Sequence, residues 1–549
     1  DKAKTPIVVC LSNNYDTGVF AFFLCSIQNP MDFMCQPHLM VMSHSLIYYV
    51  LNIQEKGGYF ILFTLSKLQV IKNSKYVFDV KFVENPIDRS TLFSTVIIGE
   101  NGTGKSYLLT VISEILRILD SSMRKSDLSL RYDEYYLEYF ISKNKYRIEI
   151  INKQLRCFKN DALIDYGKND LPARILATSF MINDKFTFSP YDTKRDEFYS
   201  YLGIRRTSNA TWTTSIINRV SNNLIRNIDN IDFIENLNKI FHFMSFQPKI
   251  SILFEPTNKT LFSRKSAYST IENKINSFKK KNDFRSDSIR KYTQNDIEDI
   301  EYFINNISRD RSKIKLNNKN CLEYLISFDN SKSKKYELSE DYNVLLKLIE
   351  LKLIKSPILK FYKDDDFEFE YASSGEKHLL FTLINIAAEL KENSLVLIDE
   401  PELSLHPNWQ MNYINALKVI FSRMKSCHFI MATHSHYLVS DLEKASSSLV
   451  HLKLLKEDKH LYREANLLDF NTYGLSAENI LYNVFGVRTT RNLYFEIDLR
   501  ELINLISINS KDFDRITYLK SKIQSYIIDQ NDPVNLLIFE VERYIKNDS

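Results

Sequence analysis

The stretch Gly99-Glu100-Asn101-Gly102-Thr103-Gly104-Lys105-Ser106 decides the fold of this chain. It reads G-x-x-x-x-G-K-S and lies between an apolar run at residues 94–98 and a predicted helix over residues 107–119. In that context, backbone N–H groups of a glycine-rich loop surround phosphate groups, and the following helix directs its positive end at them. A chance glycine-rich turn explains the strand, the spacing and the Lys-Ser pair less well. The stretch therefore predicts a nucleoside triphosphate site in a parallel α/β sheet.

Two residues of this loop have specific expected roles in binding the nucleotide. Lys105 is expected to reach the β- and γ-phosphates, and the Ser106 hydroxyl is expected to ligate Mg²⁺. The predicted cofactors are accordingly ATP and Mg²⁺. The predicted nucleotide contacts in the loop are Gly99, Asn101, Gly102, Thr103, Gly104, Lys105 and Ser106.

A second apolar run, residues 394–398, ends in the carboxylates Asp399 and Glu400. Ligands of parallel α/β sheets bind at the carboxyl ends of the strands, so this pair is expected beside the phosphate loop. Asp399 is predicted to hold Mg²⁺, and Glu400 to orient and deprotonate the attacking water. Two carboxylates alone would equally suit a solvated strand end, but the upstream phosphate loop favours the catalytic interpretation.

Three further segments resemble motifs of the ABC-type ATPases. Ser373, Ser374, Gly375 and Glu376 begin a predicted helix and resemble the signature motif, although an ordinary helix cap has the same pattern. The run Ser-Leu-His-Pro at 404–407 resembles the loop that crosses between subunits. Residues 429–434 form an apolar run ending in His434 and resemble the switch strand; the usual proline after Thr-His-Ser is replaced by His436.

This resemblance implies an α/β P-loop NTPase of the ABC-ATPase type, with a head like those of SMC and RecF proteins. It implies an enzyme that hydrolyses ATP and forms a homodimer around two nucleotides, with Glu400 and His434 as catalytic residues. The signature residues would then cover the γ-phosphate bound by the partner subunit, because a helix N-terminus attracts an anion.

The chain divides into five predicted regions. Residues 1–41 form an N-terminal extension without an assigned role. Residues 42–190 form the N-terminal lobe with the phosphate loop, and residues 351–470 the C-terminal lobe with the signature, the carboxylates and His434. Between them, residues 191–350 are expected to be a mostly helical insertion. Residues 471–549 are expected to be helical, and Ile516, Leu519, Ile523 and Ile527 share one face that either docks a partner or packs on the head.

The length of the segment between the phosphate loop and the signature excludes some classes of ABC-type ATPase. Between Ser106 and Ser373 lie 266 residues, too many for a transporter domain and too irregular for a long coiled coil. The run I-D-E-P-E-L-S-L-H-P at 398–407 and the segment 473–487 resemble standalone ATPases of bacterial antiphage defence, in particular the ATPase subunit of Septu-type and retron-associated systems. The alternative is an SMC- or RecF-like DNA-repair ATPase that binds DNA without a nuclease.

No nuclease motif is evident in the chain, so the resemblance implies separate partners: an HNH nuclease and, in retrons, a reverse transcriptase with its RNA–DNA. Basic clusters at 279–281, 309–319 and 332–335, interleaved with Phe284, Tyr292 and Tyr336, would suit nucleic acid or simply a solvated helix face. The formal net charge of +4 decides nothing about partners. Six scattered cysteines and no apolar run of membrane-spanning length predict a cytoplasmic protein without membrane contact.

Overall fold

A computed structural model describes residues 7–12, 21–26, 63–84, 92–119, 131–181, 184–187, 198–203, 212–262, 268–279, 289, 292–309, 314–316, 320–328, 335–363, 372–457, 460–469, 472–487, 491–527 and 532–548. The chain splits into two units, Asp1–Phe60 and Ile61–Ser549. In the first unit, β1 (Ile7–Ser12) pairs with β2 (Ala21–Ser26) in an antiparallel hairpin.

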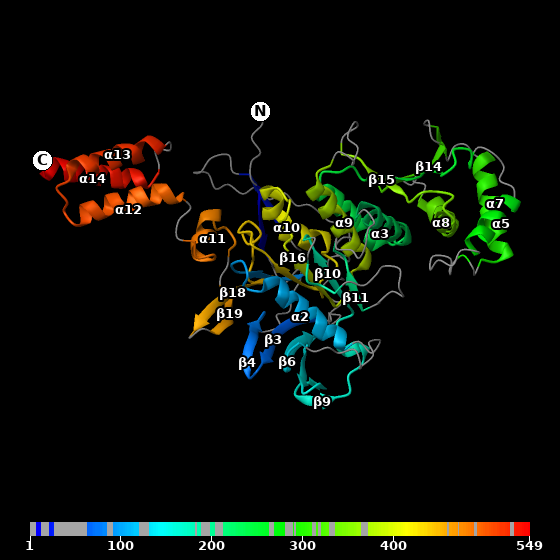
Figure 1. The fold of residues 1–549 in the computed structure, drawn as a ribbon, viewed down its shortest axis with the longest axis horizontal. Coiled ribbons are helices and arrows are strands. Elements are labelled where there is room, and N and C mark those ends of the chain that lie inside the picture. Colours follow the sequence, from blue (N-terminus) through cyan, green and yellow to red (C-terminus); the bar gives the residue numbers. More distant parts are fainter. Residues whose placement is uncertain are drawn as a thin grey trace. The chain divides into compact units, whose positions relative to one another are not determined.

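A seven-stranded sheet forms the centre of the second unit (Figure 1). Its order is β11 (Tyr199–Tyr201), β10 (Arg174–Ser179), β16 (Ser394–Asp399), β17 (His428–Ala432), β5 (Phe93–Ile98), β18 (Ser447–Glu457) and β19 (His460–Leu468). Neighbouring strands are parallel except for the last pair, β18 and β19. Every residue of β5, β16 and β17 is buried, as expected for strands covered on both faces.

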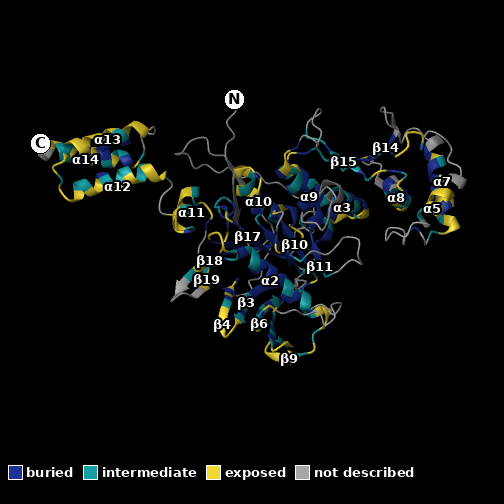
Figure 2. Cartoon of the chain, in the orientation of Figure 1, coloured by how far each residue is buried: buried dark blue, intermediate teal, exposed yellow. Residues whose placement is uncertain are grey.

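The two faces of this sheet pack into separate cores because successive side chains of a strand point in opposite directions. In β5, Val96 and Ile98 join one core and Phe93 and Ile97 the other. The first core contains α9 (Ser374–Glu389) and α10 (Pro407–Ile420), and the second contains α2 (Lys105–Ile118). Figure 2 shows the resulting buried centre.

An antiparallel sheet covers the α2 side. Its order is β4 (Lys75–Lys81), β3 (Phe63–Lys72), β6 (Glu134–Ile141), β7 (Asn144–Ile151), β8 (Gln154–Lys159) and β9 (Ala162–Ile164). Buried and half-buried residues alternate along β6, so one face of the sheet joins the α2 core. The turn between β3 and β4 has positive φ at Asn73 and Ser74, the conformation that matches the twist of a two-residue hairpin.

The insertion contains both helices and a sheet. Its helices are α3 (Trp212–Arg226), α4 (Ile231–Phe243), α5 (Tyr268–Lys279), α7 (Gln294–Arg309) and α8 (Lys335–Glu350). A four-stranded sheet, which the sequence did not predict, joins three strands of the insertion to one strand beyond its predicted end. Its order is β13 (Ile314–Leu316), β14 (Asn320–Ser327), β12 (Lys249–Phe254) and β15 (Ile358–Phe361). Much of the three basic clusters, including Phe284, lies outside the described residues.

The C-terminal region is helical, as expected, with α11 (Ala477–Asn483), α12 (Leu493–Ser507), α13 (Phe513–Tyr526) and α14 (Val534–Asp548). The last three helices share a core of their own. Ile516, Leu519 and Ile523 are fully buried in it and Ile527 packs against it, so this apolar face closes the three-helix bundle. No helix in the described part of the chain is long and apolar enough to cross a membrane.

A buried ionic network fastens the end of α9 to the sheet and the insertion. The Glu389 carboxylate accepts hydrogen bonds from Arg174 (2.7 Å, Nη2 to Oε2) and from the Ser200 hydroxyl (2.6 Å), and Arg219 lies 3.4 Å away. Burial opposes the charged carboxylate, but Arg219 and Arg174 outweigh it and lower the pKa of Glu389. The signature helix is therefore anchored at its C-terminal end through β10, β11 and α3.

We predict that Glu389→Ala lowers the free energy of unfolding by about 3–5 kcal/mol, because it leaves two largely buried guanidinium groups without their carboxylate. Glu84→Ala, which removes the exposed partner of Lys81, is the control and should leave stability unchanged. Denaturant titration followed by circular dichroism measures both. Equal midpoints for the two variants would contradict the structural importance of the network.

Candidate nucleotide site

The phosphate loop follows β5 directly, and two of its glycines have clear structural reasons. A Cβ on Gly99 would lie 2.2 Å from the Leu452 carbonyl oxygen of β18, so no larger residue fits there. Gly102 has a φ of 82°, which L-residues rarely adopt. Gly104 then caps α2, whose first residue is Lys105. The predicted strand–loop–helix arrangement is thus present, with backbone N–H groups at the start of α2 available to an anion.

Lys105 is buried at the centre of the site, with 4% of its surface exposed. Its ammonium group donates to the carbonyl oxygens of Gly99 (2.8 Å) and Glu100 (3.2 Å), and lies 2.6 Å from Nε2 of His434. Burial lowers the pKa of Lys105, and Glu400, Glu402 and Asp399 oppose that effect. The fold therefore brings together two predicted site residues that are far apart in sequence.

Arg463 of β19 supports the loop from outside and was not predicted. Its Nε donates to the Thr103 carbonyl oxygen at 2.8 Å, and its guanidinium lies over the ring of Phe78, 5.2 Å from the centroid. This contact depends on the β18–β19 hairpin and on the neighbouring antiparallel sheet. No local motif around residue 463 signals it.

Asp399 ends β16 and is 1% exposed. Burial raises the pKa of Asp399 to about 6; a hydrogen bond with Ser106 opposes this, and the nearby carboxylates Asp184 and Glu402 add to it. Its Oδ1 is buried without a hydrogen-bond partner. The sequence did not assign a role to Asp184. It lies near Asp399 because β10, which precedes it in the chain, pairs with β16.

The two predicted metal ligands, Ser106 and Asp399, are in contact. A buried carboxylate oxygen without a partner, surrounded by further carboxylates, fits a divalent cation, which would take up this negative charge. No cluster of three or more His, Cys, Asp or Glu side chains with metal-binding potential occurs within the described ranges. Magnesium commonly uses one or two protein carboxylates together with phosphate oxygens and water, so the pair suits Mg²⁺ delivered with a nucleotide.

Glu400 and His434 lie side by side, with 3.3 Å between Oε1 and Nε2. Burial raises the pKa of Glu400 to about 8, with further contributions from Glu402 and Asp399. Burial and Lys105 lower the pKa of His434 to about 4, so its ring is neutral at pH 7. Glu400 has a φ of 52°, an unfavourable backbone conformation of a kind that clusters at functional sites. Once deprotonated, a carboxyl group with a raised pKa is a stronger base than an ordinary glutamate, which suits it to accept a proton from water.

The signature residues lie at the N-terminus of α9. The Ser373 side chain accepts from the Glu376 N–H (3.2 Å), and the Glu376 carboxylate accepts from the Ser373 N–H (2.9 Å), which forms a capping box. Ser373 and Ser374 are exposed. The expected helix cap is therefore present, and it leaves Ser374 exposed at the start of α9.

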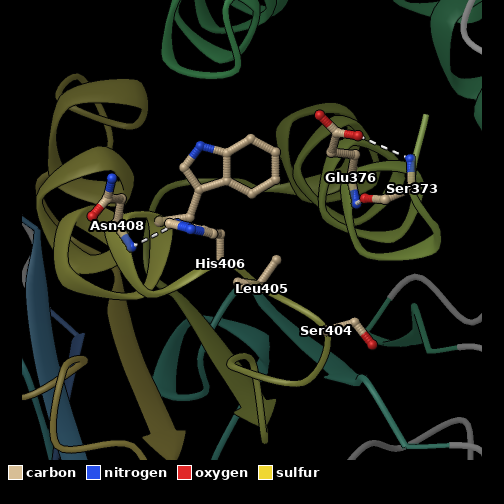
Figure 3. A pocket seen from close by; sticks show the side chains of 7 residues that line it. Ser373, Glu376, Ser404, Leu405, His406 and Asn408 are labelled. Carbon is tan, nitrogen blue, oxygen red and sulfur yellow. Dashed lines mark hydrogen bonds between the residues drawn. The ribbon is translucent and has the colours of Figure 1, made fainter.

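Gly375 links this helix end to the loop after Glu400. A Cβ on Gly375 would lie 2.0 Å from the Ser404 carbonyl oxygen, so the two segments touch at a glycine. Beside them lies a cavity of about 590 Å³ (Figure 3). It is lined by Ser373, Glu376, Ser404, Leu405, His406, Asn408 and Trp409. The hydrogen bonds of Ser373 and Glu376 run to each other and to Lys363, and none of these joins them to the phosphate loop of the same chain.

Residues 94–440 match the family described as "AAA domain, putative AbiEii toxin, Type IV TA system". The chain belongs to this family. The match runs from β5 to beyond the switch histidine, so it includes the phosphate loop, the insertion, the signature and both carboxylates. The predictions of an ABC-type P-loop fold and of an ATPase are thereby confirmed.

Two curated relatives have sequences similar to this AAA-family chain, one over a short region and the other over most of its length. The Septu protein PtuA of Bacillus thuringiensis is 31% identical over 143 residues, 23% of this chain and 35% of that protein. A "Retron Vc95 probable ATPase" of Vibrio cholerae serotype O1 biovar El Tor is 24% identical over 430 residues, 67% of this chain and 71% of that protein. Among solved structures, the Smc head bound to the C-winged helix domain of ScpA is 12% identical, with a TM-score of 0.34, and covers 74% of this chain and 98% of its own.

We predict that Lys105→Ala weakens MgATP binding by roughly 10- to 100-fold, because a buried charge-assisted contact with phosphate is lost. Isothermal titration calorimetry with MgATP measures the dissociation constant. Lys355→Ala, which removes a surface ion pair with Glu255, is the control and should bind normally. Unchanged affinity in Lys105→Ala would place the nucleotide elsewhere.

Proposed function

We propose that this protein is the ATP-operated subunit of an antiphage defence complex, and that it dimerises around two MgATP and controls a separate nuclease. The proposal rests on the observation that the predicted nucleotide-binding residues form two separate groups in one chain. Lys105, Asp399, Glu400 and His434 converge on one edge of the sheet. Ser373 and Ser374 are instead exposed at the N-terminus of α9, where the capping hydrogen bonds of Ser373 run to Glu376 of the same helix. A second copy would supply the missing half of each site.

The chemistry follows from the contacts within one chain. Lys105 would bind the β- and γ-phosphates, with Ser106 and Asp399 holding Mg²⁺, which neutralises charge on the transferred phosphoryl group. Glu400 would accept the proton of the attacking water. Neutral His434, beside Glu400, would donate a hydrogen bond to the γ-phosphate. The helix N-terminus of the second copy would cover the same phosphate, so ATP would hold the dimer together.

The proposed biological role rests on the relatives. One is a Septu protein and another a retron ATPase, and the matched region of this chain contains no motif of a nuclease. We therefore assign DNA or RNA cleavage to a separate HNH nuclease, joined in a retron by a reverse transcriptase and its RNA–DNA. ATP binding and hydrolysis would set whether the nuclease is held or released.

We predict that Glu400→Gln with MgATP is a stable dimer with at least tenfold slower turnover than the wild type, because ATP stays bound. Light scattering coupled to gel filtration measures the mass. In the same background, Ser374→Glu should return the protein to monomer while ATP still binds, because a carboxylate would face the γ-phosphate of the other copy. Trp409 lines the cavity beside Ser373, so its fluorescence should change on dimerisation only when Ser374 is intact.

A Glu400→Gln protein that turns ATP over normally would remove Glu400 from its role. A dimer that persists in the Ser374→Glu variant would contradict the shared site.

The role in defence predicts that cells carrying the native locus resist phage, and that Lys105→Ala abolishes the resistance. Plaque counts measure this, with Lys355→Ala as the control. Full protection by Lys105→Ala, or DNA-stimulated ATP hydrolysis by the chain without any nuclease at its locus, would favour a DNA-repair ATPase instead.

A further inference from the structure

Glu402 lies beside the catalytic groups, but the proposed reaction does not use it. It follows Glu400 by two residues, and its side chain lies next to the Glu400 carboxyl group. Its Oε1 accepts a hydrogen bond from the backbone N–H of His434 at 2.6 Å. Tyr413 of α10, fully buried, packs nearby. A partly buried charge is energetically costly unless it is paired, so the Glu402 carboxylate needs a hydrogen-bond donor that compensates for its burial.

The backbone at His434 needs an acceptor because the sheet ends just before it. The last residue of β17 is Ala432, and the Thr433 N–H still reaches the Ile97 carbonyl oxygen at 3.0 Å. The next N–H, that of His434, bonds to Glu402 and not to a strand. The side chain of Glu402 therefore fixes where the chain leaves the sheet.

A second contact fastens the next residue to the same loop. The Ser435 hydroxyl donates to Oε1 of Gln410 at 2.6 Å. The Gln410 amide in turn donates to the carbonyl oxygens of Leu405 (2.9 Å) and Glu402 (3.4 Å). His434 and Ser435 are thus both linked by hydrogen bonds to the loop of residues 402–405. This loop also contacts the signature helix, through Ser404 and Gly375.

The position of the His434 ring depends on this backbone. Nε2 of the ring lies 2.6 Å from Nζ of Lys105 and 3.3 Å from Oε1 of Glu400, so a small backbone displacement would break both contacts. We propose that Glu402 is a positioning residue for ATP hydrolysis, which acts by holding the His434 backbone so that the imidazole faces the γ-phosphate. This inference rests on the proposed role of His434 and adds to it a residue that acts through the His434 backbone.

Two variants separate the hydrogen-bond acceptor from the rest of the side chain. Glu402→Gln keeps an oxygen that can accept the His434 N–H, whereas Glu402→Leu has a similar volume and no acceptor. We expect Glu402→Leu to lower kcat by about 10- to 100-fold, the loss that a small misplacement of a catalytic group produces. Glu402→Gln should stay within about threefold of the wild type. Both variants should still bind MgATP, because the phosphate loop is intact.

A double-mutant cycle with His434→Ala tests the route of action. When the imidazole is absent, adding Glu402→Leu should cost no more than about twofold further in kcat, because the group it positions has gone. Equal losses in both backgrounds would overturn the inference, and so would a kcat in Glu402→Gln as low as in Glu402→Leu. His434→Ala with wild-type turnover would overturn the proposed role of His434 itself, so failure of the proposed function is distinguishable from failure of this inference.

Discussion

The register of three buried parallel strands is the constraint on which the site depends. Asp399 of β16 pairs with Ala432 of β17, and Ala432 pairs with Ile97 of β5. The loops that follow these strands therefore begin at the same edge and bring the phosphate loop, Glu400 and His434 into contact. A shift of one residue in any of the three would turn its side chains to the opposite face of the sheet. The complete burial of these strands makes such a shift costly.

The site concentrates unfavourable features that the surrounding core must stabilise. One buried lysine stands among carboxylates whose mutual repulsion and burial raise the pKa values of Asp399 and Glu400. Glu400 also adopts an unfavourable backbone conformation. Such features are common where a ligand completes the charge balance, and here Mg²⁺ and a triphosphate are the complementary groups. One of these carboxylates, Glu402, accepts a hydrogen bond from the backbone N–H of His434.

Sequence patterns were sufficient to place the phosphate loop, Asp399, Glu400 and His434 at one edge of the sheet, because each of these residues belongs to a contiguous motif with one structural context. The phosphate loop, the Asp399–Glu400 pair and the signature helix each begin or end a regular element. Arg463, Asp184 and Gln410 could not be found in this way, because their roles come from contacts between segments that no spacing encodes. The sheet of the insertion was missed because its strands are short and separated by helices. The apolar face of α13 was visible in the sequence, but its partner, the bundle's own core, was not.

The central claim is that Lys105 of one copy binds the triphosphate while the signature helix of the other copy contacts its γ-phosphate. A structure of Glu400→Gln with MgATP tests this most directly, through the distance from the Ser374 hydroxyl to the nearest γ-phosphate oxygen. The account predicts hydrogen-bond distance to the nucleotide held by the other copy's Lys105. Nucleotide bound at Lys105, with Ser374 of every copy remote from any phosphate, would contradict it.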